Sequence, residues 1–185
     1  MFNSDWIFYI GSFSKILAPS LRVGWLVVPE FLHKPLSILK EGTDINIATY
    51  TQRLVSKILD SISIENHIEA LKISYKQKRE VMFEASEKHF PKEMVIKKPR
   101  SGLFFWVKLP SWINVKELYD LCIKKYKVAF IPGDFFEINK KNKTENAIRL
   151  NFSYPTGEQI TEGIYRISQA IHELKEYNGP QKLDH

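Results

Sequence analysis

Four side chains that can do chemistry lie within eleven residues near the start of the chain: Ser12, Ser14, Lys15 and Arg22. Hydroxyl groups and a guanidinium bind a phosphate, the guanidinium through two parallel hydrogen bonds. An amine that lies near a second cation and away from water gives up its proton readily and can attack an aldehyde. This loop would therefore suit a ligand that carries both groups, of which pyridoxal phosphate is an example. A solvated turn without a ligand fits the same composition, so the residues alone leave both interpretations open.

Two short apolar runs flank this loop and predict the strands that hold it. Residues 6–10 and 23–28 are rich in aromatic and β-branched types and are bounded by Gly, Ser or Pro. Two such strands so close together belong to the interior of a sheet, so the loop between them is held at a strand end. We expect Tyr9 and Trp25 in these strands, and Trp106 further along the chain, to be core residues.

After Pro29 the sequence predicts a layer of helices on a small sheet. Apolar residues at spacings of three and four predict helices over residues 30–41, 47–61, 64–90, 115–125 and from Thr156 onward, with a break at 42–44. Short apolar runs predict strands over residues 94–97, 103–109, 128–131 and 147–152. Thr156 and Gln159 have the spacing of a capping box. The fold class is therefore α/β, with an α+β domain from residue 30 onward.

Composition and charge exclude several classes of protein. The chain has 185 residues, 44% hydrophobic and 26% charged, as in a globular domain, and it has no uncharged apolar run of about 18 residues. Its single cysteine, Cys122, forms no internal disulfide, so we expect it to be buried packing, with the cytoplasm as the compartment. We expect no metal site and no secretory signal. The net charge is +6, and the one dense basic cluster, at residues 140–143, is expected to be a solvated loop rather than a phosphate-contacting patch.

Four runs of the sequence resemble segments of the fold-type-I, pyridoxal-phosphate-dependent aminotransferases of class I/II. These runs are residues 9–29, 101–110, 128–136 and 146–171, in the family's order and at about its spacing. The branch that they most resemble is the 2-aminoadipate and aromatic aminotransferase group, which is kynurenine aminotransferase-like. The same domain occurs, fused to a winged-helix domain, in transcription regulators of the MocR/GntR type.

The resemblance implies a role for five residues. Lys15 matches the lysine that binds the cofactor aldehyde covalently and moves the proton during transamination. Ser12 and Arg22 match the phosphate-binding serine and arginine, and Ser14 matches the hydroxyl position just before the lysine. Arg149 matches the arginine that holds the α-carboxylate of the amino acid, although a surface charge on a strand is the alternative.

Two further segments match loops that approach the substrate entrance in this family. They contain Gly102 with Phe104, and Pro132 with Gly133. An architectural role is an equally open interpretation for these residues.

The resemblance covers the second half of the family's fold, which decides what we expect of the chain as a whole. Residues 1–29 would be the last strands of the large cofactor-binding domain, residues 30–178 the small domain, and residues 179–185 a tail. The residues that contact the pyridine ring come from the other half, so we expect an aminotransferase chain that is inactive alone. The alternative is the effector domain of a MocR/GntR-type regulator.

Two expectations about surfaces follow from the same resemblance. The strands at 6–10 and 23–28 should expose apolar edges and faces. The expected assembly is a homodimer, with residues 43–52 near its interface, and the expected substrates are an amino acid and a 2-oxo acid. We expect no contact of this chain with a membrane or with nucleic acid.

Overall fold

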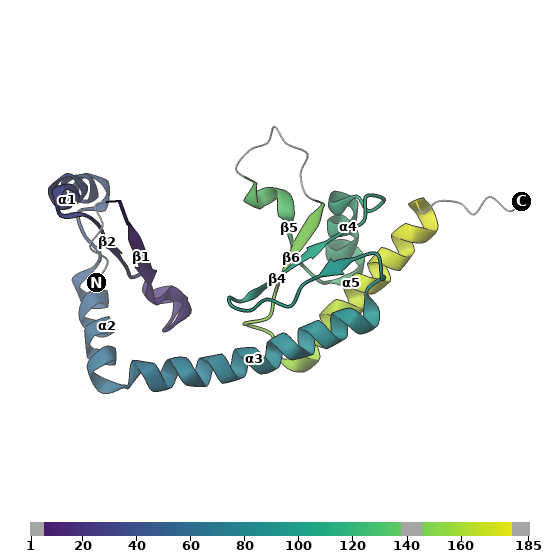
Figure 1. Cartoon of the computed structure of the whole chain (residues 1–185), viewed down its shortest axis with the longest axis horizontal. Coiled ribbons are helices and arrows are strands. Elements are labelled where there is room, and N and C mark those ends of the chain that lie inside the picture. The colour runs from purple at the N-terminus through teal and green to yellow at the C-terminus, as the bar shows by residue number, and fades with distance from the viewer. Residues whose placement is uncertain (1–5, 138–145, 179–185) are drawn as a thin grey trace, which may run out of the picture. The chain divides into compact units, whose positions relative to one another are not determined.

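A computed structural model describes residues 6–137 and 146–178 and divides the chain into two compact units, Met1–Lys72 and Ile73–His185. The basic cluster at 140–143 and the expected tail lie outside the described residues. The elements are β1 (Tyr9–Ser12), η1 (Phe13–Lys15), η2 (Pro19–Leu21), β2 (Gly24–Val27), α1 (Glu30–Asp44), α2 (Thr49–Ser61), α3 (Ile64–His89), β3 (Val95–Ile96), β4 (Phe104–Lys108), α4 (Val115–Leu121), the π-helical turn η3 (Cys122–Tyr126), β5 (Ile131–Pro132), η4 (Gly133–Phe136), β6 (Ala147–Asn151) and α5 (Gly157–Asn178) (Figure 1).

The first unit carries the antiparallel pair β1–β2, which holds the lysine loop between its strands. Gly11 lies opposite Trp25 in the register, and a Cβ atom at Gly11 would lie 2.0 Å from Cε2 of that indole. The glycine therefore makes room for the indole, whose ring centroid lies 4.8 Å from that of Phe13. These contacts hold the two strand ends of the loop together.

The prediction that Tyr9 and Trp25 in these two strands are core residues is wrong. The side chain of Tyr9 is 50% exposed and that of Trp25 is 38% exposed, and Ile10 and Val27 beside them are exposed as well. The reason is that β1 and β2 pair only with each other in the described part of the chain. The expectation that these strands expose apolar surface is thereby confirmed. Trp106, in the second unit, is half-buried rather than fully buried.

Helix α1 runs three residues further than expected, through the predicted break at Gly42. Lys40 forms an ion pair with Asp44 one turn later, and the Thr43 hydroxyl donates to the carbonyl of Leu39 at 2.7 Å. No neighbouring atom lies within 4 Å of the place where a Cβ atom of Gly42 would stand. Local contacts along the helix therefore outweigh the low helix propensity of one glycine, about 1 kcal/mol against alanine.

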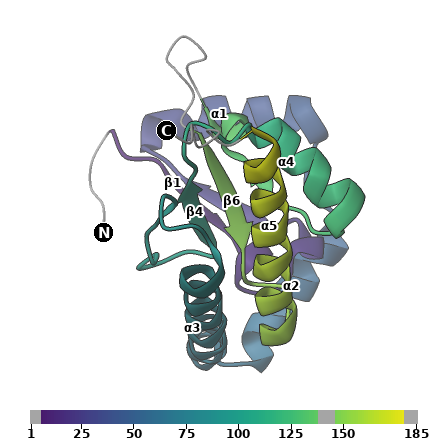
Figure 2. The same ribbon diagram turned by 90° about the vertical axis from the view of Figure 1, so that its right-hand side faces the viewer.

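The second unit contains a four-stranded antiparallel sheet in the order β3-β4-β6-β5. Figure 2 shows α4 and α5 in front of strands β4 and β6. Side chains from one face of the sheet pack with α3, α4 and α5 into the core, which includes Met82, Phe105, Val107, Leu118, Cys122, Ile148, Leu150, Ile160, Ile164 and Ile171. Burial raises the pKa of the Cys122 thiol to about 12, and the expected packing role of this residue is confirmed. No helix in the described parts of the chain is long and apolar enough to span a membrane.

The beginning of α5 has the capping box that the sequence predicts. The backbone amide of Gln159 donates to the Thr156 hydroxyl at 3.2 Å, and the backbone amide of Thr156 donates to Oε1 of the Gln159 side chain at 3.0 Å. Each side chain satisfies a backbone donor that the first turn of a helix leaves without a partner.

The segment around residues 115–131 differs from the prediction in two places. The expected helix changes at Cys122 into a π-helical turn, after which Lys127 takes a left-handed backbone conformation with φ of 53°. The Val128 amide donates to the Cys122 carbonyl at 3.1 Å, so the chain folds back before any strand can form. Phe130 is buried against the ring of Tyr119, at 5.5 Å between centroids, and strand β5 begins only afterwards.

Replacing the central core residue Phe105 by alanine should destabilise the second unit by about 3–5 kcal/mol. Its side chain is fully buried, and its ring meets the edge of Phe152 at 5.8 Å, so the substitution leaves a cavity. Urea denaturation followed by near-UV circular dichroism measures the change. Phe135→Ala is the matched control, because Phe135 is 77% exposed and should change stability by less than about 0.5 kcal/mol. Equal effects of the two substitutions would contradict this assignment of the core.

Candidate functional site

The lysine loop is built from two short 3₁₀ turns between β1 and β2. The Ser12 hydroxyl accepts a hydrogen bond from the Ser14 amide at 3.1 Å and so caps η1, the turn that carries Lys15. The Phe13 amide donates to the carbonyl of Val23 at 3.0 Å, which closes the loop. The structure therefore gathers the four predicted residues of the loop in one closed segment of the first unit.

The two cations of this loop have no acidic partner among residues 6–137 and 146–178. The side chains of Lys15 and Arg22 are exposed. Arg22 takes a left-handed backbone conformation, with φ of 51°, and its guanidinium donates to the carbonyl of Pro19 at 3.3 Å. Two unbalanced cations and two hydroxyl groups in one loop fit a ligand with a phosphate and an aldehyde. On this donor set the residues present fit pyridoxal phosphate.

His67, in the first turn of α3, holds the backbone directly after Lys15. Its Nε2 atom lies 2.8 Å from the carbonyl oxygen of Ile16. Because a carbonyl can only accept, Nε2 must carry the proton in this contact. The sequence offered no signal for this role, because a contact between residues 51 positions apart depends on the tertiary fold.

Arg149 lies in β6 of the second unit, on the face of the sheet opposite the core. Its neighbours in the register are Trp106 of β4 and Ile131 of β5. The central carbon of the guanidinium lies 4.1 Å from the ring centroid of Phe104 and 4.0 Å from that of Phe136. The predicted carboxylate-binding residue is therefore half-buried among aromatic rings rather than free on the surface.

Gly133 allows η4 to approach the sheet closely enough to bring Phe136 to this place. A Cβ atom at Gly133 would lie 2.9 Å from the carbonyl oxygen of Ala147 and 3.1 Å from Cη2 of Trp106. The rings of Trp106 and Phe136 then meet edge to face, with 6.0 Å between centroids. Gly133 thus has an architectural role here, and Phe136, which the sequence analysis did not single out, is the residue that it positions.

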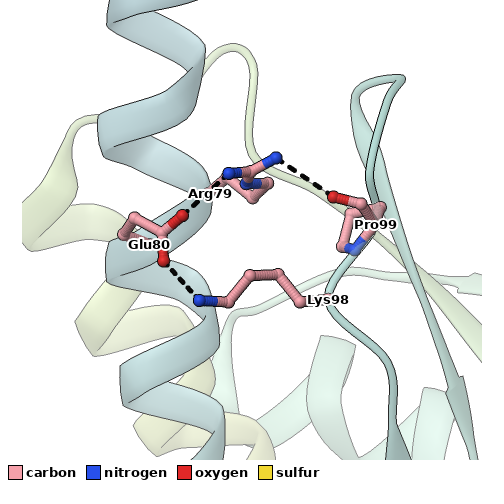
Figure 3. A network of polar contacts seen from close by, with 4 residues as sticks. All are labelled: Arg79, Glu80, Lys98 and Pro99. Atoms are coloured by element: carbon pink, nitrogen blue, oxygen red, sulfur yellow. Dashed lines mark hydrogen bonds and ion pairs between the residues drawn. The ribbon is translucent and has the colours of Figure 1, made fainter.

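A charged network fixes the turn that leads into β4 and hence to Phe104. Glu80 of α3 accepts from Arg79 at 2.8 Å and from Lys98 at 2.5 Å, and Arg79 also donates to the carbonyl of Pro99 at 3.1 Å (Figure 3). Three residues later the turn passes through Gly102, whose φ of 82° favours glycine. The hydrogen bonds from Lys98 and then Arg79 hold the pKa of Glu80 below its ordinary value of 4.5.

Comparison with curated proteins finds relatives of two kinds. The chain is 36% identical over 168 residues to aromatic-amino-acid aminotransferase 1 of Thermococcus litoralis, covering 90% of this chain and 39% of that protein. It is 34% identical to the 2-aminoadipate transaminase of Thermus thermophilus, over 91% of this chain and 41% of that protein. It is also 33% identical to the uncharacterized HTH-type transcriptional regulator YdfD of Bacillus subtilis, over 91% of this chain and 34% of that one. No family model matches.

Solved structures that share this fold include aminotransferases. The kynurenine aminotransferase of Pyrococcus horikoshii, solved with PMP, matches with a TM-score of 0.84 at 36% identity, over 92% of this chain and 42% of that one. An α-aminoadipate aminotransferase of Thermus thermophilus, complexed with N-(5'-phosphopyridoxyl)-L-leucine, also matches at 0.84, with 31% identity over 92% of this chain and 43% of that one. The chain spans about two fifths of the length of the aminotransferases that it matches. Its homologues are thus aminotransferases and HTH-type regulators, and its fold is that of a part of the former.

Glu80→Gln should lower stability at neutral pH and remove part of the acid sensitivity of the second unit. The pKa of Glu80 is lowered in the folded state, so its contribution is present above the unfolded value of 4.5 and is lost as pH falls through the folded value. The difference in urea midpoint between wild type and variant should therefore shrink to zero as pH is lowered from 7 to 2.5. Glu84→Gln, an exposed site on the same helix, is the control and should show no such trend. A constant difference at all pH values would contradict the charged network.

His67→Ala should loosen the lysine loop. The substitution removes the donor to the Ile16 carbonyl, a loss of about 1 kcal/mol, which corresponds to roughly five-fold faster local opening. Amide hydrogen exchange of Leu17, which donates to the Phe13 carbonyl at 2.8 Å, reports this opening. His172→Ala, at an exposed site in α5, should leave the exchange unchanged. Unchanged exchange in His67→Ala would show that His67 does not hold the loop.

Proposed function

We propose that this chain is the lysine-bearing part of a pyridoxal-phosphate-dependent aminotransferase, which moves an amino group between an amino acid and a 2-oxo acid. The observation that carries the proposal is the closed loop with Lys15, Arg22 and two serines, whose cations have no acidic partner in the described part of the chain. The aminotransferase relatives, 36% and 34% identical over nine tenths of the chain, support the same reading.

Each residue of the loop has a separate task in this proposal. Ser12, Ser14 and Arg22 would bind the phosphate, and Lys15 would bind the aldehyde carbon through its Nζ atom. When bound, the pyridoxal ring supplies an acceptor for the electrons of the bond that breaks at the substrate Cα. The substrate amine would displace Lys15 from the aldehyde carbon, and the freed Nζ would then take the proton from Cα and deliver it to the former aldehyde carbon, as an amine held within reach can do. The hydrogen bond from His67 to Ile16 keeps the backbone beside this amine in place.

Arg149 would bind the α-carboxylate of the amino acid and of the 2-oxo acid. A guanidinium held in a fixed plane binds a carboxylate through two parallel hydrogen bonds and so orients the substrate.

A second candidate function is the effector domain of an HTH-type regulator. The observation that favours it is the 33% identity to YdfD over 91% of the chain. In such a protein the loop would bind the same cofactor without turnover. Formation of a 2-oxo acid from an amino acid by the protein that contains this chain, detected by mass spectrometry, distinguishes transfer from binding alone.

The assembly and compartment complete the proposal. We propose a homodimer in the cytoplasm, with residues 43–52 near the interface between the subunits. Ile45 and Tyr50 in this segment are 76% and 79% exposed in the single chain, which leaves apolar surface available for a second subunit.

Pyridoxal phosphate followed by borohydride should attach stably to Lys15 in preference to other lysines. Peptide mapping by mass spectrometry locates the attachment. Lys15→Ala should abolish it, whereas Lys57→Ala, at an exposed site on α2, should leave it unchanged. Modification spread over surface lysines, with no preference for Lys15, would contradict the proposal.

The phosphate contacts have their own test. Arg22→Ala should weaken half-saturation by pyridoxal phosphate about ten-fold or more, because a charged hydrogen-bonding group is lost. It should leave the reaction with pyridoxal, which has no phosphate, unchanged. An equal effect on both aldehydes would assign Arg22 to loop structure instead.

A further inference from the structure

The guanidinium of Arg149 is fixed by aromatic rings and not by acids. Its central carbon lies 4.1 Å and 4.0 Å from the ring centroids of Phe104 and Phe136. Its Nε atom is buried and has no hydrogen-bond partner. No acidic side chain in the described parts of the chain pairs with it. The positive charge at this position is therefore unbalanced.

Arg79, in the same unit, is held by hydrogen-bond acceptors instead of aromatic rings. Its terminal nitrogens donate to the Pro99 carbonyl at 3.1 Å and to the Glu80 carboxylate at 2.8 Å, so these two donors serve the fold (Figure 3). Its Nε atom, like that of Arg149, is buried without a hydrogen-bond partner, so the two arginines differ in the use of their terminal nitrogens. Aromatic rings attract a guanidinium through their π faces and use none of its N–H groups. At Arg149 the attraction of two rings therefore restrains the side chain while its terminal donors stay available.

We propose that Phe104 and Phe136 are positioning residues that hold the Arg149 guanidinium in the plane in which it binds a carboxylate. This inference rests on the carboxylate-binding role of Arg149 in the proposed function. Two rings within about 4 Å of the guanidinium carbon restrict how the group can turn, and a flat carboxylate that approaches in the guanidinium plane receives two parallel hydrogen bonds. Neither ring needs to touch the ligand for this effect.

The two rings come from elements that the fold places independently. Phe104 lies on β4, two residues from Trp106, and so on the same face of the sheet as Arg149. Phe136 comes from η4, which Gly133 and the edge-to-face contact with Trp106 hold against the sheet. The register of β4 with β6 thus places Phe104 beside Arg149, and the close approach of η4 to the sheet places Phe136 there.

Acetate binding to the full chain, without any cofactor, tests the proposal. Titration at constant ionic strength, followed by the Nε–Hε signal of Arg149 in NMR, gives the dissociation constant. We expect Phe104→Leu and Phe136→Leu to weaken acetate binding by about two- to five-fold each and to move the Arg149 signal in the free chain, because leucine keeps apolar bulk but lacks a π face. Phe135→Leu, next to Phe136 but 77% exposed, should change neither. Acetamide, which is uncharged, should not bind.

The outcomes separate this inference from the proposed function. If the leucine variants bind acetate as tightly as wild type does, the positioning role is overturned, while the cofactor reaction at Lys15 is unaffected. If acetate binds elsewhere and leaves the Arg149 signal unmoved, the carboxylate site itself is overturned. Phe136→Tyr and Phe104→Tyr keep the ring and should restore wild-type binding, and failure of both to do so would contradict the π-face argument. Far-UV circular dichroism confirms that each variant is folded.

Discussion

The pairing of β4 with β6 is the constraint on which the second unit depends. In this register Phe105 faces Leu150 and Trp106 faces Arg149, so successive pairs point to opposite faces of the sheet. A slip of one residue would bury the guanidinium among the helices and expose the apolar core. The core and the surroundings of Arg149 are therefore fixed by one set of backbone hydrogen bonds, and the helices that pack on the core also secure the geometry on the other face.

Three arginines of the chain show how surroundings decide the use of one side-chain type. The terminal nitrogens of Arg79 donate to Glu80 and to the Pro99 carbonyl, and these bonds hold the turn before β4 against helix α3. Arg22 has one contact with the Pro19 carbonyl and no acidic partner in the described residues. Arg149 is restrained by two aromatic rings and has no acidic partner among residues 6–137 and 146–178. A guanidinium that pairs with no carboxylate of the protein has its N–H groups available to bind the carboxylate or phosphate of a ligand.

Local patterns predicted well what local interactions decide. The capping box at Thr156, the long helix α3 and the gathering of Ser12, Lys15 and Arg22 in one loop follow from spacing over a few residues. The break expected at Gly42 was wrong because contacts between successive turns outweigh one glycine.

Features that depend on distant contacts left no trace in the spacing of residues. Residues 128–130 were predicted as a strand from their composition, yet the left-handed turn at Lys127 sends them back toward η3. The contact of His67 with the lysine loop and the place of Phe136 over Arg149 could not be predicted either, because both join segments that meet only in the folded unit. The domain boundary expected at residue 29 rests on the family resemblance and stays a prediction.

Because Cys122 is buried, the reactivity of its thiol reports unfolding of the second unit. The thiol is fully buried among core side chains, and its raised pKa, about 12, leaves almost no reactive thiolate at neutral pH. Since the sequence has no other cysteine, a thiol-specific reagent can modify the chain only when the second unit opens. The rate of thiol modification would thus measure how often this core is exposed to water, without any engineered cysteine.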